Sequence, residues 1–195
     1  VDVAMSDGAA WFSAEVWPLP LAGQDVSRVG NRHWFHAPYN LYQAQDRPVA
    51  VGVEKDRQWQ SLLQVMDRQD LLGDPRYATS EDRVRRVDEV DRLVEEWAVS
   101  LKAADAVSRC QAAGVPAAPV QEIGEVVEHP NTRDRETIIE RSGYRIFGSP
   151  IKFSRTPLTV EDLGPALGQH NDEVLGGLLG LSRDQRENLK AEGVI

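Results

Sequence analysis

Two stretches without hydrophobic periodicity constrain the fold of this 195-residue chain more than any other feature of its sequence. Residues 17–34 and 154–168 each contain several prolines and glycines, and we interpret both as linkers. The block between them, residues 35–153, is long enough to bury a core of its own. The terminal segments, residues 1–16 and 169–195, are too short to do so. We therefore expect them to belong to a second body.

The first half of the central block alternates strand and helix patterns. Residues 39–42 and 49–53 flank an Asp-Arg-Pro turn and predict a hairpin. A helix over residues 57–66, capped by Asp56, follows. Apolar residues at spacings of three and four predict one long helix through residues 84–97, with its start near Ser80 and its charged residues facing solvent.

The second half of the block is less regular. Residues 103–113 predict a helix that ends at Gly114, and the two prolines in residues 115–120 favour extended backbone. Residues 121–128 predict a short helix stopped by His129-Pro130, and residues 135–153 predict one or two strands.

The terminal segments have patterns of their own. Residues 1–5 alternate as a strand does, and a helix follows that opens at Ser6-Asp7. Two helices are expected near the other end, one capped by Asn171 and one by Ser182. Because a strand and a helix at a terminus normally have partners, we expect the chain to be the C-terminal part of a longer protein. The predicted fold class is a small α+β domain with an antiparallel hairpin sheet, plus terminal segments that belong to a second body.

Composition limits the function. The formal net charge of −9 argues against nonspecific nucleic-acid binding, which needs a basic surface. No apolar run approaches the roughly 20 residues of a membrane-spanning helix, so we expect no membrane partner. The single cysteine, Cys110, excludes an internal disulfide and fits a cytoplasmic location.

The sequence contains few residue patterns that signal chemistry. His33 and His36 form an HxxH pair, but no third ligand lies nearby, and we predict a packed loop with no metal. Cys110 has no identifiable histidine neighbour and is interpreted as structural. There is no phosphate-binding glycine loop, GxSxG elbow or HExxH motif.

An ordered series of segments nevertheless resembles the family III CoA-transferases, which include formyl-CoA transferase, carnitine CoA-transferase and α-methylacyl-CoA racemase. The segments are VDVAMSD at 1–7, APYNLY at 37–42, VAVGV at 49–53 with QW at 58–59, LLGDPRY at 71–77, GVPAAPV at 114–120, and LGQHN at 167–171. No one of these motifs is diagnostic, but their order is fairly specific and covers nearly the whole chain.

The resemblance implies a chain about twice as long, with a large α/β domain, a small α+β domain and a tail that returns to the large domain. Residues 1–16 would then end a large α/β domain that is mostly missing from this chain, and residues 169–195 would be the returning tail. Two such chains interlock as a homodimer. The nucleophilic Asp of the family lies upstream of the segment that matches Val1, so no catalytic residue is expected in this chain. Asp7 matches a helix start instead. The substrates implied are an acyl-CoA and a carboxylic acid, with no covalently bound cofactor.

The resemblance also points to candidate contacts. The small domain of transferases supplies a loop over the active site that is often glycine-rich, and the matching stretch, residues 30–36, lacks the glycine run. Side-chain donors would replace it, and the substrate-facing candidates are His36, Tyr39, Asn40 and Glu54. Lys55, Asp56 and Arg57 form a turn that borders the CoA site in some relatives, where Lys and Arg can bind phosphates.

Three functions remain open on the sequence. The first is a CoA-transferase that moves CoA between carboxylic acids. The second is a racemase of the same family, whose catalytic Glu matches the position of Lys55, one residue after Glu54; this offset favours the transferase. The third is a non-catalytic interaction or dimerisation module.

Overall fold

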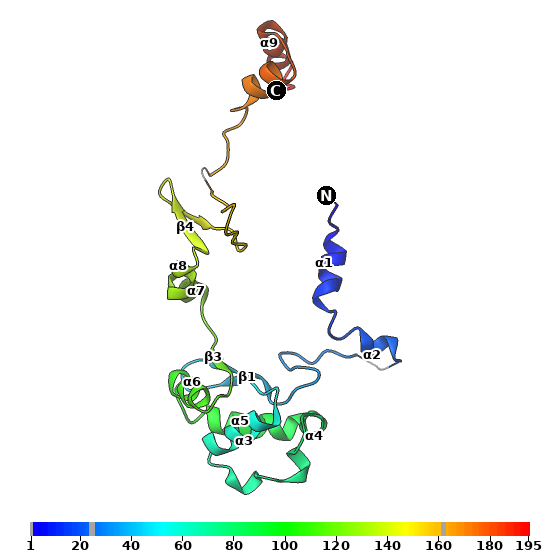
Figure 1. Cartoon of the computed structure of the whole chain (residues 1–195), viewed down its shortest axis with the longest axis vertical. Coiled ribbons are helices and arrows are strands. Elements are labelled where there is room, and N and C mark those ends of the chain that lie inside the picture. Colours follow the sequence, from blue (N-terminus) through cyan, green and yellow to red (C-terminus); the bar gives the residue numbers. More distant parts are fainter. Residues whose placement is uncertain (1, 24–25, 161–162) are drawn as a thin grey trace. The chain divides into compact units, whose positions relative to one another are not determined.

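The computed structural model describes residues 2–23, 26–160 and 163–195 (Figure 1). Its internal contacts divide the chain into a first unit that ends at Val120 and a second that begins at Gln121. This boundary lies inside residues 35–153, which the sequence predicts to form one block. The limits of that block stay a prediction. No helix among the described residues is both long enough and apolar enough to cross a membrane.

A three-stranded antiparallel sheet forms the centre of the first unit, in the order β1-β2-β3. Strand β1 spans Tyr39–Gln43, β2 spans Pro48–Gly52 and β3 spans Ala117–Pro119. Tyr39 pairs with Gly52 and Val51 pairs with Ala117. The predicted hairpin and the predicted extended segment are therefore confirmed, and they belong to one sheet.

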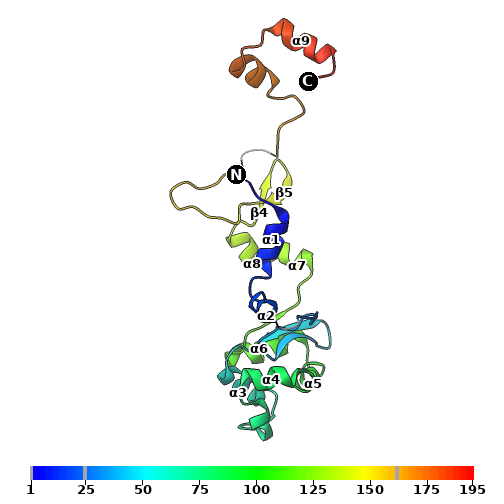
Figure 2. The same cartoon turned by 90° about the vertical axis from the view of Figure 1, so that its right-hand side faces the viewer.

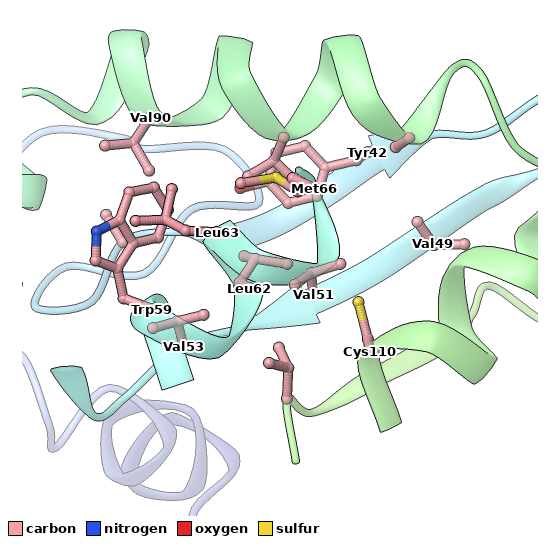
Figure 3. Packing of buried hydrophobic residues seen from close by; sticks show 14 of the residues in the cluster. Tyr42, Val49, Val51, Val53, Trp59, Leu62, Leu63, Met66, Val90 and Cys110 are labelled. Atoms are coloured by element: carbon pink, nitrogen blue, oxygen red, sulfur yellow. The ribbon is translucent and has the colours of Figure 1, made fainter. Parts of the chain in front are cut away.

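Helices cover one face of this sheet. They are α3 (Asp56–Val65), α4 (Ser80–Arg85), α5 (Val87–Ala98) and α6 (Ala103–Ala112), with single 3-10 turns η1 (Gln69–Leu71) and η2 (Pro75–Tyr77). Figure 3 shows Trp59, Leu62 and Leu63 of α3 packed near Val51 of β2, and all four are at most 2% exposed. The other face of the sheet stays open: Tyr39 is 39% exposed and Leu41 40%.

Local details of the helices differ from the prediction. Lys55, with extended backbone, is the N-cap of α3, and Asp56 is its first helical residue. The long helix predicted through residues 84–97 is two helices, because the backbone at Arg86 leaves the helical region. The cap of α4 is Thr79, whose side chain accepts a hydrogen bond from the backbone of Asp82 at 3.2 Å.

The prediction that charged residues of this helical stretch face solvent is wrong at two positions. Arg83 on α4 is fully buried, and Asp91 on α5 is 9% exposed. Each is surrounded by hydrogen-bond partners, as buried charges must be. Most of these partners lie far away along the chain.

The first unit also contains α1 (Met5–Phe12) and the single turn α2 (Pro18–Leu21). The strand predicted over residues 1–5 is wrong for its described part, since residues 2–4 have no strand assignment and Met5 begins a helix. An isolated strand has no backbone partner. Pro18 at the first position of α2 is compatible with a helix start inside the predicted linker.

The second unit contains short elements and no buried residue among those described. They are α7 (Ile123–Glu128), α8 (Pro130–Asp134), the hairpin strands β4 (Ile138–Arg141) and β5 (Tyr144–Phe147), the π-helix η3 (Asp172–Leu178) and α9 (Arg183–Ala191) (Figure 2). The predicted strands are confirmed. Pro130 stops α7 and also begins α8. Ser182 caps α9 as predicted, whereas the Asn171 side chain makes no capping bond.

Candidate functional site

An open groove of about 420 Å³ lies on the uncovered face of the three-stranded sheet. Its lining includes Tyr39, Asn40, Leu41, Ala50, Gly52 and Glu54. Three of the four predicted substrate-facing residues therefore meet in one groove, and His36 is not among its lining residues. The small residues of β2 keep the floor close to the backbone, which gives a flat ligand room to approach the sheet.

Tyr39 is held in the groove by its neighbours. Its ring lies over Gly52 of the adjacent strand, where an added Cβ would sit 3.0 Å from Tyr39 Cε2. The ring of His33 packs against it at 4.9 Å between centroids. No described residue hydrogen-bonds the Tyr39 hydroxyl, so this group is available to a ligand.

Asn40 already has partners for both ends of its amide. Its Nδ2 donates to Asp91 Oδ2 at 3.1 Å, and its Oδ1 accepts the backbone N–H of Leu41 at 2.8 Å. Two residues on, the N–H of Gln43 donates to the Glu95 carboxylate at 3.2 Å. Because β1 is an edge strand, these side chains satisfy outward-facing donors of the edge. The structure thus gives Asn40 a structural task.

His36 lies beside the start of α4. Its Nδ1 is 3.3 Å from Ser80 Oγ, and that hydroxyl donates to the carbonyl of Phe35 at 2.9 Å. Since the serine proton is used, the Ser80 hydroxyl can only accept from the His36 ring. This contact fixes the His36 ring beside the start of α4.

The turn before α3 presents two unpaired cations. The backbone N–H groups of Glu54 and Lys55 both donate to Gln58 Oε1, at 3.1 and 2.9 Å, which fixes the turn. Lys55 and Arg57 are exposed, and neither has a partner among the described residues. Asp56, by contrast, pairs with Arg83 Nη2 at 3.0 Å. Of the three predicted CoA contacts, the structure leaves the two cations free and engages the acid internally.

Asp91 is an important residue that the sequence-based prediction missed. Its Oδ1 accepts from the Tyr42 hydroxyl at 2.7 Å, and its Oδ2 accepts from Arg32 Nε at 2.7 Å. Burial and the negative charge of Asp91 raise the pKa of the Tyr42 hydroxyl above its ordinary value. The signal was present, because Asp91 lies four residues after Val87 and three before Val94, on the apolar stripe of α5.

The other chemical candidates from the sequence have packing roles in the structure. The rings of His33 and His36 pack against each other in a tilted arrangement, with 4.7 Å between centroids. Among the described residues, no group of three or more potential ligands could hold a metal ion. Cys110 is fully buried, and burial raises the pKa of its thiol to about 11, which disfavours the nucleophilic thiolate.

Solved structures share this fold. A CAIB/BAIF family protein from Brucella suis matches with a TM-score of 0.73 and 26% identity, covering 91% of this chain and 47% of that one. The hypothetical protein Rv3272 from Mycobacterium tuberculosis matches with a TM-score of 0.75 and 23% identity, covering 89% of this chain and 46% of that one. The class is therefore the CAIB/BAIF-like α+β proteins.

The family follows from the sequence comparison. The model of CoA-transferase family III matches residues 1–171, and the chain belongs to that family. Similar curated proteins include the formyl-CoA:oxalate CoA-transferase of Streptomyces coelicolor, 33% identical over 70% of this chain and 34% of that protein. The succinyl-CoA--D-citramalate CoA-transferase of Chloroflexus aurantiacus is 31% identical over 100% of this chain and 50% of that protein. The chain thus spans half or less of the length of these relatives.

Proposed function

We propose that this chain is the C-terminal part of an enzyme that transfers CoA between carboxylic acids. The family match supports CoA chemistry. The structural observation that carries the proposal is the combination of a groove lined by Tyr39 and Glu54 with a following turn that exposes two unpaired cations, Lys55 and Arg57. Such a surface suits a ligand with an uncharged end and a phosphorylated end.

The proposed reaction proceeds through an aspartate upstream of Val1. One carboxylate oxygen attacks the thioester carbonyl, the C–S bond breaks, and CoA leaves as a thiolate while a mixed anhydride forms. The thiolate then attacks the aspartyl carbonyl, which releases the first acid and leaves CoA as a thioester on the enzyme. The acceptor carboxylate next attacks the aspartyl thioester, which releases the CoA thiolate and forms a second mixed anhydride. The thiolate then attacks the acyl carbonyl of the acceptor, which gives the new acyl-CoA and frees the aspartate. Net atoms and charges balance without a cofactor.

The residues of this chain bind and orient in this scheme. Lys55 and Arg57 contact the phosphates of CoA as a point charge and a fork, respectively. The free hydroxyl of Tyr39 donates a hydrogen bond to a substrate oxygen, and His36 is a second candidate contact. The enzyme is expected to work in the cytoplasm as a homodimer, or through association with the missing N-terminal part.

A racemase of the same family is the second candidate. The observation in its favour is that Glu54 lines the groove and that its carboxylate has no partner among the described residues. A carboxylate there could abstract the α-proton of an acyl-CoA. The racemase Glu matches the next position, which Lys55 occupies here. Because of this one-residue offset, we favour the transferase over the racemase.

One reaction mixture separates the candidates. The native polypeptide is incubated in D₂O with an acyl-CoA labelled in its CoA portion and with a panel of free carboxylic acids. Appearance of the label in a new thioester supports the transferase, whereas deuterium at the α-carbon without label transfer supports the racemase. Neither product with any acid would leave a non-catalytic interaction module and would contradict the proposal.

A further inference from the structure

The guanidinium of Arg83 joins segments that are far apart in the sequence. Arg83 Nε donates to the carbonyl of Ala37 at 2.7 Å, and Nη1 donates to the carbonyl of Tyr77 at 3.1 Å. Nη2 donates to Asp56 Oδ1 at 3.0 Å. The side chain is fully buried, and its Cζ lies 5.7 Å from the centre of the Trp59 ring.

Two of these partners belong to the segments that carry the candidate contacts. Ala37 follows His36 and precedes the β1 residue Tyr39, which lines the groove. Asp56 lies between Lys55 and Arg57 in the turn before α3. One rigid group therefore holds both segments. A hydrogen bond between backbone groups also joins the same two segments: the N–H of Val53 donates to the carbonyl of Pro38 at 2.8 Å.

The electrostatics of the site indicate that the directions of its hydrogen bonds, rather than charge pairing, account for the buried guanidinium of Arg83. Burial lowers the pKa of Arg83, although its pairing with Asp56 opposes this effect. The Asp56 side chain is 54% exposed, so the carboxylate that pairs with the cation is partly solvated. Arginine presents donors in a fixed planar fork, and a lysine ammonium cannot reproduce three bonds in these directions.

We propose that Arg83 is a positioning residue whose buried guanidinium sets the spacing between the His36–Asn40 segment and the Glu54–Arg57 turn. The part of this inference that concerns ligand contacts rests on the proposed function. Arg83 touches no ligand in this account. It acts through Ala37 and Asp56.

Amide hydrogen exchange of the native polypeptide tests the positioning directly and without a ligand. In Arg83→Lys, exchange should accelerate about tenfold in residues 33–40 and 53–58 together, while core amides of α5 change less. Val94→Ala, a fully buried truncation in α5, is the control for general loss of stability, and it should accelerate the amides of α5 and its neighbours instead. Equal acceleration everywhere in Arg83→Lys would overturn the proposal.

A milder pair of variants guards against failure of Arg83→Lys to fold. Asp56→Ala removes one partner of the guanidinium and should accelerate exchange in residues 53–58 and, more weakly, in residues 33–40. Asp70→Ala removes a similarly exposed carboxylate, paired with Arg68 at 2.9 Å, and should leave both segments unchanged. No difference between these two variants would also overturn the proposal.

Titration with CoA itself tests the consequence for ligand contacts. If the native polypeptide binds CoA, Asp56→Ala and Arg83→Lys should raise its dissociation constant about tenfold, and Asp70→Ala should not. Unchanged affinity in a variant with accelerated exchange would contradict the positioning role. Absence of CoA binding in the native polypeptide would instead contradict the proposed function, and the exchange results would still decide whether Arg83 couples the two segments.

Discussion

At the scale of single residues, Asp91 is the acceptor on which the polar side chains beside β1 converge. The hydroxyl of Tyr42, the amide of Asn40 and the guanidinium of Arg32 all donate to its two oxygens. A buried carboxylate with three donors is satisfied, but its removal deprives the Tyr42 hydroxyl and the Asn40 amide of their acceptor. This residue therefore links the segment before the sheet, β1 and α5.

Removal of this carboxylate should be costly. Asp91→Ala leaves buried donors unpaired and should lower the free energy of unfolding by about 3–5 kcal/mol. Asp88→Ala is the matched control, because Asp88 pairs with the same arginine at 2.7 Å but its side chain is 80% exposed. We expect the control to cost less than about 1 kcal/mol. Urea unfolding of both variants gives the comparison, and similar losses would refute the role assigned to Asp91.

Cys110 predicts a pH dependence of stability. Burial raises the pKa of its thiol from an ordinary value of 9.0 to about 11 in the folded chain. A raised folded pKa means that the stabilisation is complete below about pH 9 and is lost as the pH rises toward 11. The stability advantage of the wild type over Cys110→Ala should therefore shrink by about 2 kcal/mol between pH 8 and pH 11. Parallel pH profiles of the two proteins would show that the thiol is not buried as described.

At the scale of elements, both edges of the three-stranded sheet are covered by side chains. Asn40 and Glu95 accept the outward N–H groups of Leu41 and Gln43 on β1, and Gln111 Nε2 donates to the carbonyl of Ala117 on β3 at 3.0 Å. Covered edges resist the addition of another strand. The open face, rather than an edge, is therefore the part of this sheet that a ligand can use.

The hairpin of the second unit depends on a glycine. A Cβ on Gly148 would lie 2.1 Å from the backbone carbonyl oxygen of Glu136, and Gly148 itself donates to the carbonyl of Thr137 at 2.9 Å. Gly148→Ala should destabilise the β4–β5 hairpin by about 1–3 kcal/mol, because a backbone atom cannot move aside cheaply.

A second glycine of the same unit provides the control for this prediction. Gly124 lies in α7 with nothing within 4 Å of an added Cβ, so Gly124→Ala should stabilise that helix by up to about 1 kcal/mol. Amide exchange over residues 137–148 and 123–128 measures both effects. Unchanged exchange of the hairpin in Gly148→Ala would contradict the packing described.

The elements of this fold were largely predictable from sequence, because their apolar periods and turn residues are local. The β1–β2 hairpin, α6, the β4–β5 hairpin and the Ser182 cap all follow from neighbouring residues. The sequence also placed Tyr39 and Glu54 among the candidates that the groove brings together. What it missed depends on distant partners.

The missed features have a common physical cause. Arg32 and Asp91 are 59 positions apart, and no periodicity connects them. Likewise, the sequence around Arg83 predicts an exposed charge, because its partner, the carbonyl of Ala37, is 46 positions away in the sequence. The predicted start of α4 was wrong by a smaller amount. Thr79 and Ser80 can both cap a helix, and Thr79 is the residue that caps α4.

At the scale of the whole molecule, the terminal segments expose apolar residues that need a cover. Phe12 is 94% exposed and Leu178 78%. Exposed apolar surface of this kind is typical of an interface. The association proposed above, with an N-terminal part or with a second copy, would cover this surface.

Limited proteolysis checks this organisation. In the 195-residue chain alone, cleavage is expected first within residues 17–34 and 154–168, because the segments predicted to connect compact bodies are preferred sites of proteolysis. A folded fragment close to residues 35–153 should survive. Early cleavage inside that block, with the two terminal segments surviving as one compact unit, would refute the predicted division.

The same chain should be inactive by itself. In the proposed mechanism the nucleophile is an aspartate upstream of Val1, so turnover of acyl-CoA by these 195 residues should be absent and CoA affinity weak. The measurement is label transfer from acyl-CoA to free acids by the purified 195 residues. Turnover at an enzyme-like rate would mean that the nucleophile lies within this chain.

The central claim is that this chain belongs to a CoA-transferase whose nucleophile lies outside its 195 residues. Intact mass spectrometry of the native polypeptide, before and after incubation with acyl-CoA, tests it most directly. We predict a polypeptide well above 21.7 kDa that gains the mass of a CoA thioester, with peptide mapping placing the adduct on an aspartate upstream of Val1. A native polypeptide of 21.7 kDa, or an adduct on a residue of this chain, would contradict the account.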